Sequence, residues 1–455
     1  MKTKHVDMLS GSVMRGLFAL TLPVMIMNVA QSLFSLADTA ALKAFGHATA
    51  VGAAGAVATL QTVFTHVISG VAVGANVVIA RHLGAGERRR AERSISTGLI
   101  LSLAVGLILF VGGALLARPL LLLTNCPEVL LAEATTYFRI YFFGVPILAV
   151  YTFTATALRA LGDTRRPMRI LFIGCGAKLI LTVTLLAITG KGVESAAIST
   201  LLANLIKAVL SMIALLRSRE IVTVNLGRLE FDRGALGATL YNGIPPTIQT
   251  VLYSLANVVL LSAVNTFGPD ATTGISIANQ YDGVIYNLVY APSLAVIPYI
   301  AQNIGAGNPE RAKRAMRCGM LIGVGFGATL GTLSAALAPQ LSGLLATSPA
   351  AVEFAVQKMV IISSTYFICG INDVLGGALK GMGRPISPMI SNLLYLCGLR
   401  CVWVYCIFPL FPNLTFLYLV WPISWTLSIV TLIPFLIRAL KRLGKKEETC
   451  DAAVA

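Results

Sequence analysis

The chain has 455 residues, of which 56% are hydrophobic and 12% charged, with a mean hydropathy of +0.81 and a formal net charge of +16. Soluble domains carry about 25% charged residues, so this composition excludes an ordinary soluble protein. Apolar runs of about 20 residues recur along the whole length, and each can cross a hydrocarbon core of about 30 Å. Such runs are too long for the alternating strands of a membrane β-barrel, so the sequence predicts an all-α integral membrane protein.

Hydropathy along the chain predicts about twelve transmembrane helices. In the first half we place them at about 15–41, 50–80, 94–117, 133–157, 170–189 and 193–216. In the second half they are at about 236–266, 271–301, 318–338, 352–377, 388–411 and 415–438. Each half therefore holds six spans of similar length.

Several short motifs occur twice, about 221 positions apart. The repeated blocks are Ala80–Arg93 with Ala301–Arg314, Ala157–Met168 with Ala378–Met389 and, one residue outside this register, Pro23 with Pro245. Self-similarity at one spacing indicates an internal duplication. An even number of spans in each half makes the two repeats parallel, related by an axis along the membrane normal. The predicted parts are an N-terminal lobe (1–216), a cytoplasmic linker (217–235), a C-terminal lobe (236–438) and a cytoplasmic tail (439–455).

Basic residues concentrate in alternate connections. The N-terminus, the even-numbered connections and the tail carry clusters such as Arg88–Arg90, whereas the odd-numbered connections hold only Lys43, Arg118 and Lys191. Positive charge marks the cytoplasmic side, so both termini are predicted to be cytoplasmic. This distribution explains the net charge by orientation and lipid contact, and nucleic acid is not an expected partner.

The duplicated motifs resemble those of the multidrug and toxic compound extrusion family, in its bacterial form, which implies a place in a bacterial inner membrane. The resemblance rests on the two Gly-Ala-Gly blocks, the blocks around Arg159 and Lys380, Pro23 with Asp38-Thr39, and the 192–200 segment of the sixth span. It implies two six-helix lobes facing a central cleft. It also implies antiport, by alternating access, of amphipathic, often cationic compounds against H⁺ or Na⁺, with no other cofactor.

Ionisable groups inside a span cost about 2.5–3.5 kcal/mol on insertion scales, so each needs a partner, water or a function. The resemblance makes Asp38 the cation-coupling carboxylate, and the only metal ligand if the ion is Na⁺. Described sodium sites of the family carry two polar residues on the fifth span, and counting back from Gly192 places Lys178 and Thr182 there. A lysine near Asp38 would act as an internal counter-ion. Thr200, from the sixth-span motif, completes the expected ion-coupling set. The alternatives are that Asp38 pairs with Lys43 and that Lys178 extends to an interface.

The second half offers Asp282, Asp373 and Arg400, for which an ion pair of Arg400 with either aspartate is the favoured interpretation. A glutamate that sodium-coupled members carry in the seventh span is absent, since Leu252 and Tyr253 stand there. Further polar residues are expected to line the substrate cleft. The full cleft set is Asn28, Gln31, Gln61, Gln249, Asn257, Gln280, Tyr281, Asp282, Asp373 and Arg400.

Two other function classes remain open at this point. A lipid-linked precursor flippase of the same superfamily would have a strongly basic cavity, whereas the intramembrane basic residues here are few. An integral membrane transferase would need clustered carboxylates or a histidine motif, and neither DDxxD nor HxxxxD occurs. The expected protein is therefore a monomeric transporter, not an enzyme, with small amphipathic or cationic substrates and membrane lipid as partners.

Overall fold

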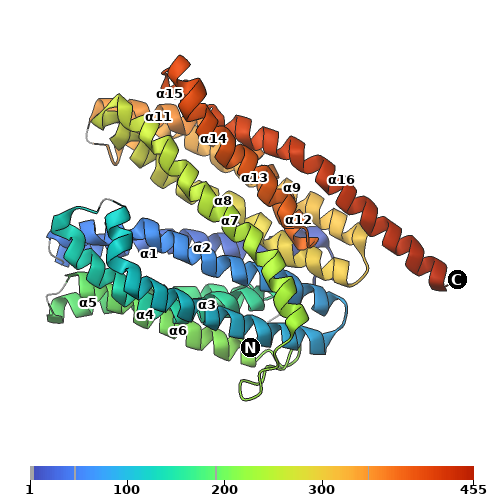
Figure 1. Ribbon diagram of the computed structural model, residues 1–455. Coiled ribbons are helices and arrows are strands. Elements are labelled where there is room, and N and C mark those ends of the chain that lie inside the picture. Colours follow the sequence, from blue (N-terminus) through green and yellow to red (C-terminus); the bar gives the residue numbers. More distant parts are fainter. Residues whose placement is uncertain (1–4, 46–47, 125, 190–191, 347, 455) are drawn as a thin grey trace. The chain divides into compact units, whose positions relative to one another are not determined.

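The computed structural model describes residues 5–45, 48–124, 126–189, 192–346 and 348–454, and these residues are overwhelmingly helical. The helices of the first half are α1 (Val13–Phe45), α2 (Ala48–Gly84), α3 (Arg88–Leu123), α4 (Glu128–Ala160), α5 (Arg165–Thr189) and α6 (Gly192–Leu216). They coincide with the six spans predicted there, because each apolar run is long enough for one crossing and ends at a polar turn (Figure 1).

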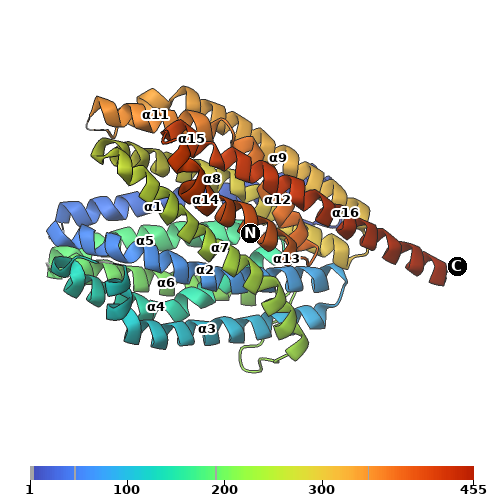
Figure 2. The same ribbon diagram turned by 45° about the horizontal axis from the view of Figure 1, so that its top comes forward.

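The second half contains the same six spans with more interruptions. Its long helices are α7 (Arg233–Val264), α8 (Pro269–Gly305), α9 (Pro309–Ala336), α11 (Pro349–Ser363), α12 (Tyr366–Gly381) and α16 (Val420–Val454), and its short ones are α10 (Ala338–Gly343), α13 (Ile386–Asn392), α14 (Leu399–Val402) and α15 (Leu414–Tyr418). Among the described residues, eleven helices are long and apolar enough to cross a membrane, or twelve if α11 and α12, bent by 49°, form one span. The last helix, α16, continues into the stretch predicted as the tail and ends at Val454 (Figure 2).

Two compact units divide the chain at points within α1 and α7. Unit 1 contains residues 1–5 and 29–247, and unit 2 contains residues 6–28 and 248–455. The first sixteen residues of α1 therefore pack with unit 2, and the first fifteen of α7 pack with unit 1. The units thus differ from the sequence halves at these two helices. Hydropathy identifies a span, but it holds no information on which neighbours each end of a long helix contacts.

Aromatic packing around α4 forms the core of unit 1. Phe138 and Phe142 of α4 are completely buried, and Phe64 of α2 meets Phe142 edge to face with 5.0 Å between ring centroids. In Figures 1 and 2, α4 runs beside α2, α3 and α6. Since lipid is as apolar as these side chains, close packing rather than burial from water stabilises the bundle.

Small residues bring the helices of unit 2 close together. A Cβ added to Gly331 of α9 would lie 2.0 Å from the backbone oxygen of Ser363, at the end of α11. A Cβ on Gly370 of α12 would lie 2.7 Å from the backbone oxygen of Gly323. Such contacts are typical of membrane helices, in which glycine lets backbones approach.

The duplicated motifs form the same turn in each repeat. Gly86 and Gly307 have φ of +72° and +69°, and Gly162 and Gly383 have φ of +83° and +73°. Each pair is 221 residues apart, since 307 − 86 and 383 − 162 both equal 221. Glycine adopts this left-handed conformation without steric cost, which explains why the motif needs it after a helix.

Within unit 2, Arg311 holds the N-terminal segment of residues 6–12 against α9. Its guanidinium donates to the backbone oxygens of Met8 (3.0 Å), Gly11 (2.9 Å) and Ser10. Within the segment, the Ser10 hydroxyl and the Leu9 amide donate to Asp7, and these hydrogen bonds hold the pKa of the Asp7 carboxyl below its ordinary value. The segment is therefore held by a group of charge-assisted hydrogen bonds.

Candidate functional site

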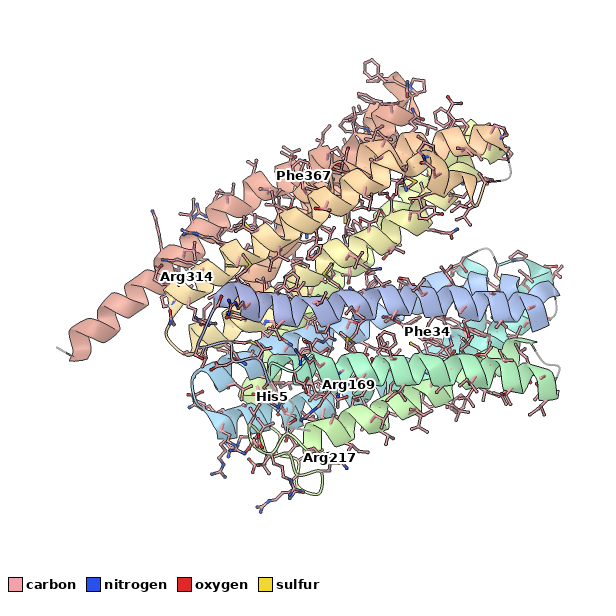
Figure 3. The ribbon with its side chains drawn as sticks, turned by 180° about the vertical axis from the view of Figure 1, so that it is seen from behind. His5, Phe34, Arg169, Arg217, Arg314 and Phe367 are labelled. Carbon is pink, nitrogen blue, oxygen red and sulfur yellow. The ribbon has the colours of Figure 1, made fainter. Side chains whose placement is uncertain are left out.

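The structure brings Asp38, Lys178 and Thr182 together in unit 1. Lys178 Nζ of α5 lies 2.8 Å from Asp38 Oδ2 of α1, and Thr182 Oγ1 donates to Asp38 Oδ1 at 3.1 Å. Lys178 and Thr182 are four residues apart, so both project from the same face of α5. One turn before Asp38, Phe34 packs edge to face against Phe172 of α5 with 6.3 Å between centroids, which turns this face of α1 toward α5 (Figure 3).

Ser199 of α6 extends this cluster and was missed by the sequence analysis. Its hydroxyl lies 2.7 Å from Thr182 Oγ1, and both residues are completely buried. The Ser199 hydroxyl also lies 2.9 Å from the backbone oxygen of Ala196, to which it can donate its proton. Ser199 stands beside Thr200 in the motif that drew attention to α6, and Thr200 also donates to the backbone oxygen of Ala196.

The pair is only partly shielded from its surroundings. The side chains of Asp38 and Lys178 are 14% and 27% exposed. The carboxylate is therefore accessible to a small ion and is neutralised by a charge that can move away on a flexible stem. The alternative partner Lys43 lies outside the side chains that the structure describes, and a role of this cluster in ion coupling stays a prediction.

Unit 2 contains a second buried ion pair. Lys358 Nζ of α11 lies 2.9 Å from Asp282 Oδ2 of α8 and also donates to Asn279 Oδ1. The Lys358 side chain is 3% exposed and that of Asp282 is 12% exposed, while Asp282 Oδ1 has no hydrogen-bond partner. The neighbouring Tyr281 donates to the backbone oxygen of Leu341 at 2.8 Å, which links α8 to α10.

The expected ion pair of Arg400 with Asp282 or Asp373 is wrong. Asp282 is taken by Lys358, and Asp373 Oδ2 lies 3.7 Å from the thiol of Cys369. Arg400 is completely buried, and its Nη1 donates to Asn257 Oδ1 at 3.2 Å. Within the described part of the chain, no carboxylate oxygen comes within 4.0 Å of the guanidinium. Lys358 competes successfully for Asp282 because it lies on a helix that packs directly against α8.

The remaining polar residues expected in a cleft are dispersed over both units. Gln61 belongs to unit 1, and Asn28 donates to the backbone oxygen of Asn287 at 2.8 Å within unit 2. Gln31 and Gln280 are exposed, and Gln249 Oε1 is buried with no hydrogen-bond partner. Their membership of one substrate cleft stays a prediction. No group of three His, Cys, Asp or Glu residues in the described segments is arranged to hold a metal ion.

Family, sequence and structure comparisons all relate this chain to one group of membrane transporters. The MatE family model matches residues 23–184 and again residues 245–406, so the family domain occurs twice. The chain is 25% identical over 399 residues to the probable multidrug resistance protein YoeA of Bacillus subtilis, covering 86% of each, and 27% identical over 400 residues to an FAD transporter of Shewanella oneidensis, covering 86% and 87%. A solved outward-facing MATE multidrug transporter shares the fold, with a TM-score of 0.88 at 20% identity over 98% of this chain and 100% of that one. The chain therefore belongs to the MatE family of multi-pass membrane transporters, the multidrug and toxic compound extrusion proteins.

Proposed function

We propose that this protein is an antiporter that exports small amphipathic molecules in exchange for protons, with Asp38 as the proton-carrying group. The observation that supports the proposal most directly is the contact of Asp38 with Lys178 and Thr182. Protonation of Asp38 removes the negative charge that holds Lys178, so it changes which contacts α1 makes with α5. A proton thereby biases the equilibrium between two conformations, which is what alternating access requires.

The charge of Lys178 favours a proton over sodium. A sodium ion beside Asp38 would stand close to the ammonium group, and two unit charges 4 Å apart repel by about 4 kcal/mol at an effective dielectric constant of about 20. A proton avoids this repulsion because it neutralises the carboxylate without adding an ion. The residues expected to supply further ligands add little, since Thr182 donates its proton to Asp38 and Thr200 bonds to its own helix.

The basic residues support cytoplasmic termini and a cytoplasmic linker at 217–235. Arg169 near the start of α5 and Arg217 after the end of α6 lie toward the same end of the helices of unit 1 (Figure 3). Arg93 at the start of α3 pairs with Glu230 of the linker, with 2.7 Å between Nε and Oε2. We place this end in the cytoplasm of a bacterial cell because of the positive-inside rule.

Transport into liposomes with an imposed gradient tests the proposal. Wild-type protein, Asp38→Asn and, as a matched control in the other buried pair, Asp282→Asn would be reconstituted and supplied with ethidium or FAD. A pH gradient alone should drive wild type and Asp282→Asn, whereas Asp38→Asn should lose at least about 90% of the rate. Transport driven by sodium alone, and unaffected by Asp38→Asn, would show that the ion and the site are both wrong.

A further inference from the structure

Arg400 occupies the same position in the second repeat as Lys178 in the first. The two family matches, 23–184 and 245–406, have equal lengths, and both residues are 155 positions from the start of their match (178 − 23 and 400 − 245). The glycine turns before these helices, at Gly162 and Gly383, are 221 residues apart, whereas Lys178 and Arg400 are 222 apart (400 − 178). A π-helical segment at Leu393–Gly398 lies between the second turn and Arg400. A π-helical turn accommodates one extra residue, which brings Arg400 into register with Lys178.

The partner of the cation differs between the repeats. Asp38 lies fifteen positions after the start of the first match (38 − 23), and the residue fifteen positions after the start of the second (260 − 245) is Leu260, which is 2% exposed. Lys178 therefore has a carboxylate from the first helix of its repeat, and Arg400 has a leucine at that place. The repeat supplies a positive charge at this position twice and a matching negative charge once.

The surroundings of Arg400 are polar but uncharged. Nη1 donates to Asn257, Nη2 lies 3.5 Å from Ser424 Oγ, and Nε has no partner although the side chain is completely buried. The rings of Tyr253 and Trp421 each lie 5.1 Å from the guanidinium carbon. Cation–π contacts and single neutral hydrogen bonds offset only part of the desolvation of a buried charge.

Nearby carboxylates are engaged elsewhere. Asp282 pairs with Lys358, while Asp373 Oδ1 and Oδ2 are contacted by Asn372 (3.5 Å) and Cys369 (3.7 Å). Asn257, the residue that holds Nη1, is itself exposed, so its side chain can turn away without leaving a buried gap. Nη1 and Nη2, whose contact with Ser424 Oγ is 3.5 Å long, would then present two donors side by side, the arrangement with which arginine binds a carboxylate or a phosphate.

We propose that Arg400 binds the carboxylate or phosphate group of an amphipathic transport substrate, whose flat apolar body stacks on Tyr253 and Trp421. The proposal rests on the transport function argued above and adds the chemical class of the substrate. Tyr253 and Trp421 are half-buried, so their rings are available on one side to an apolar ligand. A second π-helical segment, Trp403–Ile407, follows Arg400, and such segments occur frequently at functional sites.

Equilibrium binding to purified full-length protein, without any gradient, tests the site. Fluorescein is the anionic probe, and rhodamine 6G carries the same ring system with a positive charge. Arg400→Gln should weaken fluorescein binding by at least about tenfold, since a tenfold change corresponds to about 1.4 kcal/mol, less than a charged hydrogen bond can contribute. Rhodamine 6G binding should not fall. Arg139→Gln removes the same charge from an exposed position in unit 1 and should leave fluorescein binding unchanged.

A second variant keeps the test valid if Arg400→Gln does not fold. Asn257→Asp supplies a fixed carboxylate as the partner of Arg400, so it should raise the unfolding temperature and weaken fluorescein binding at the same time. A purely structural arginine would give the first effect without the second. Equal binding of fluorescein by wild type, Arg400→Gln and Asn257→Asp, or no binding by wild type, would overturn the proposal.

Competition distinguishes the sources of the anionic group. Displacement of fluorescein by 1-naphthoate or 1-naphthyl phosphate, but not by neutral 1-naphthol, identifies a soluble carboxylate or phosphate with an apolar body. Displacement by inorganic phosphate alone indicates that the ring contributes nothing, which contradicts the stacking on Tyr253 and Trp421. Weaker probe binding in nanodiscs containing phosphatidylglycerol than in phosphatidylcholine alone assigns the site to a lipid headgroup and overturns a substrate role. Because no gradient is used, loss of proton coupling would not affect these results.

Discussion

Removal of Lys358 should destabilise unit 2 more than removal of Lys178 destabilises unit 1. Lys358→Met leaves the Asp282 carboxylate, which is 12% exposed, with one oxygen already lacking a partner and the other newly unpaired. Breaking a buried pair in this way costs about 3–5 kcal/mol. Lys178 is 27% exposed and Asp38 keeps the Thr182 hydroxyl, so Lys178→Met should cost less, about 1–2 kcal/mol.

Tryptophan fluorescence is a suitable assay because all three tryptophans, Trp403, Trp421 and Trp425, belong to unit 2. Thermal unfolding in detergent would be followed for Lys358→Met, Asp282→Asn and the double variant. For a chain of 455 residues, a loss of 1 kcal/mol lowers the midpoint by about 1 °C, so Lys358→Met should lower it by about 3–5 °C. The double variant removes both charges and should recover most of this loss.

Additivity decides whether the reasoning holds. If the double variant is destabilised by the sum of the two single effects, Lys358 and Asp282 do not interact, and the ion pair contributes nothing. If Lys178→Met lowers stability as much as Lys358→Met, burial does not set the cost of an unpaired carboxylate in these bundles. Either result would refute the use of burial to rank the two pairs.

Three further predictions concern packing, pH and the N-terminal segment. Gly331→Ala should lower stability by about 1–3 kcal/mol because a methyl group would meet the backbone of the neighbouring helix, whereas Gly325→Ala on the same helix has free space and should be neutral in the same thermal assay. Hydrogen bonds lower the folded-state pKa of Asp7, so its contribution is present at neutral pH and lost as the pH falls through that pKa; Asp7→Asn should lower the midpoint at neutral pH, and this effect should shrink as the pH falls below 3.8, the ordinary pKa of the group. Arg311→Ala should speed hydrogen exchange of residues 8–11 by at least about fivefold, because their carbonyls lose a charged donor.

Hydropathy and the repeated glycines allowed most of the fold to be predicted. A span needs an apolar run of fixed length, and a left-handed turn needs glycine, so both requirements appear directly in the sequence. The contact of Lys178 with Asp38 could also be predicted, because a charge in an apolar helix needs a partner and the sixth-span motif set the register. The division of α1 and α7 between the two units could not be predicted, since both parts of each helix have the same composition.

The sequence did not allow the correct ion-pair partner to be predicted where one charge had several possible partners. Arg400 was expected to pair with an aspartate, but Lys358 takes Asp282. The choice depends on which faces of α8, α11 and α14 meet, and the π-helical segment before Arg400 rotates its side chain relative to a regular helix. Ser199 was missed for a similar reason, because both Ser199 and Thr200 bond to the backbone of α6 and only the packed structure shows that Ser199 also reaches Thr182.

Duplication gives both repeats a cation at one position, and the difference in its partner separates two tasks. In unit 1 the charge is matched by Asp38, so addition of a proton changes the balance, and the pair suits coupling to a proton gradient. In unit 2 the charge is matched by no carboxylate of the described chain within 4.0 Å, so an anion supplied from outside restores the balance. Placing a carboxylate at the position of unit 2 that corresponds to Asp38 tests this division of tasks directly. Leu260→Asp should neutralise Arg400 and abolish binding of the anionic probe, while proton-driven movement of a cationic dye, which depends on Asp38, should persist. If Leu260→Asp leaves fluorescein binding unchanged, position 260 does not correspond to Asp38, and the two repeats do not share this site.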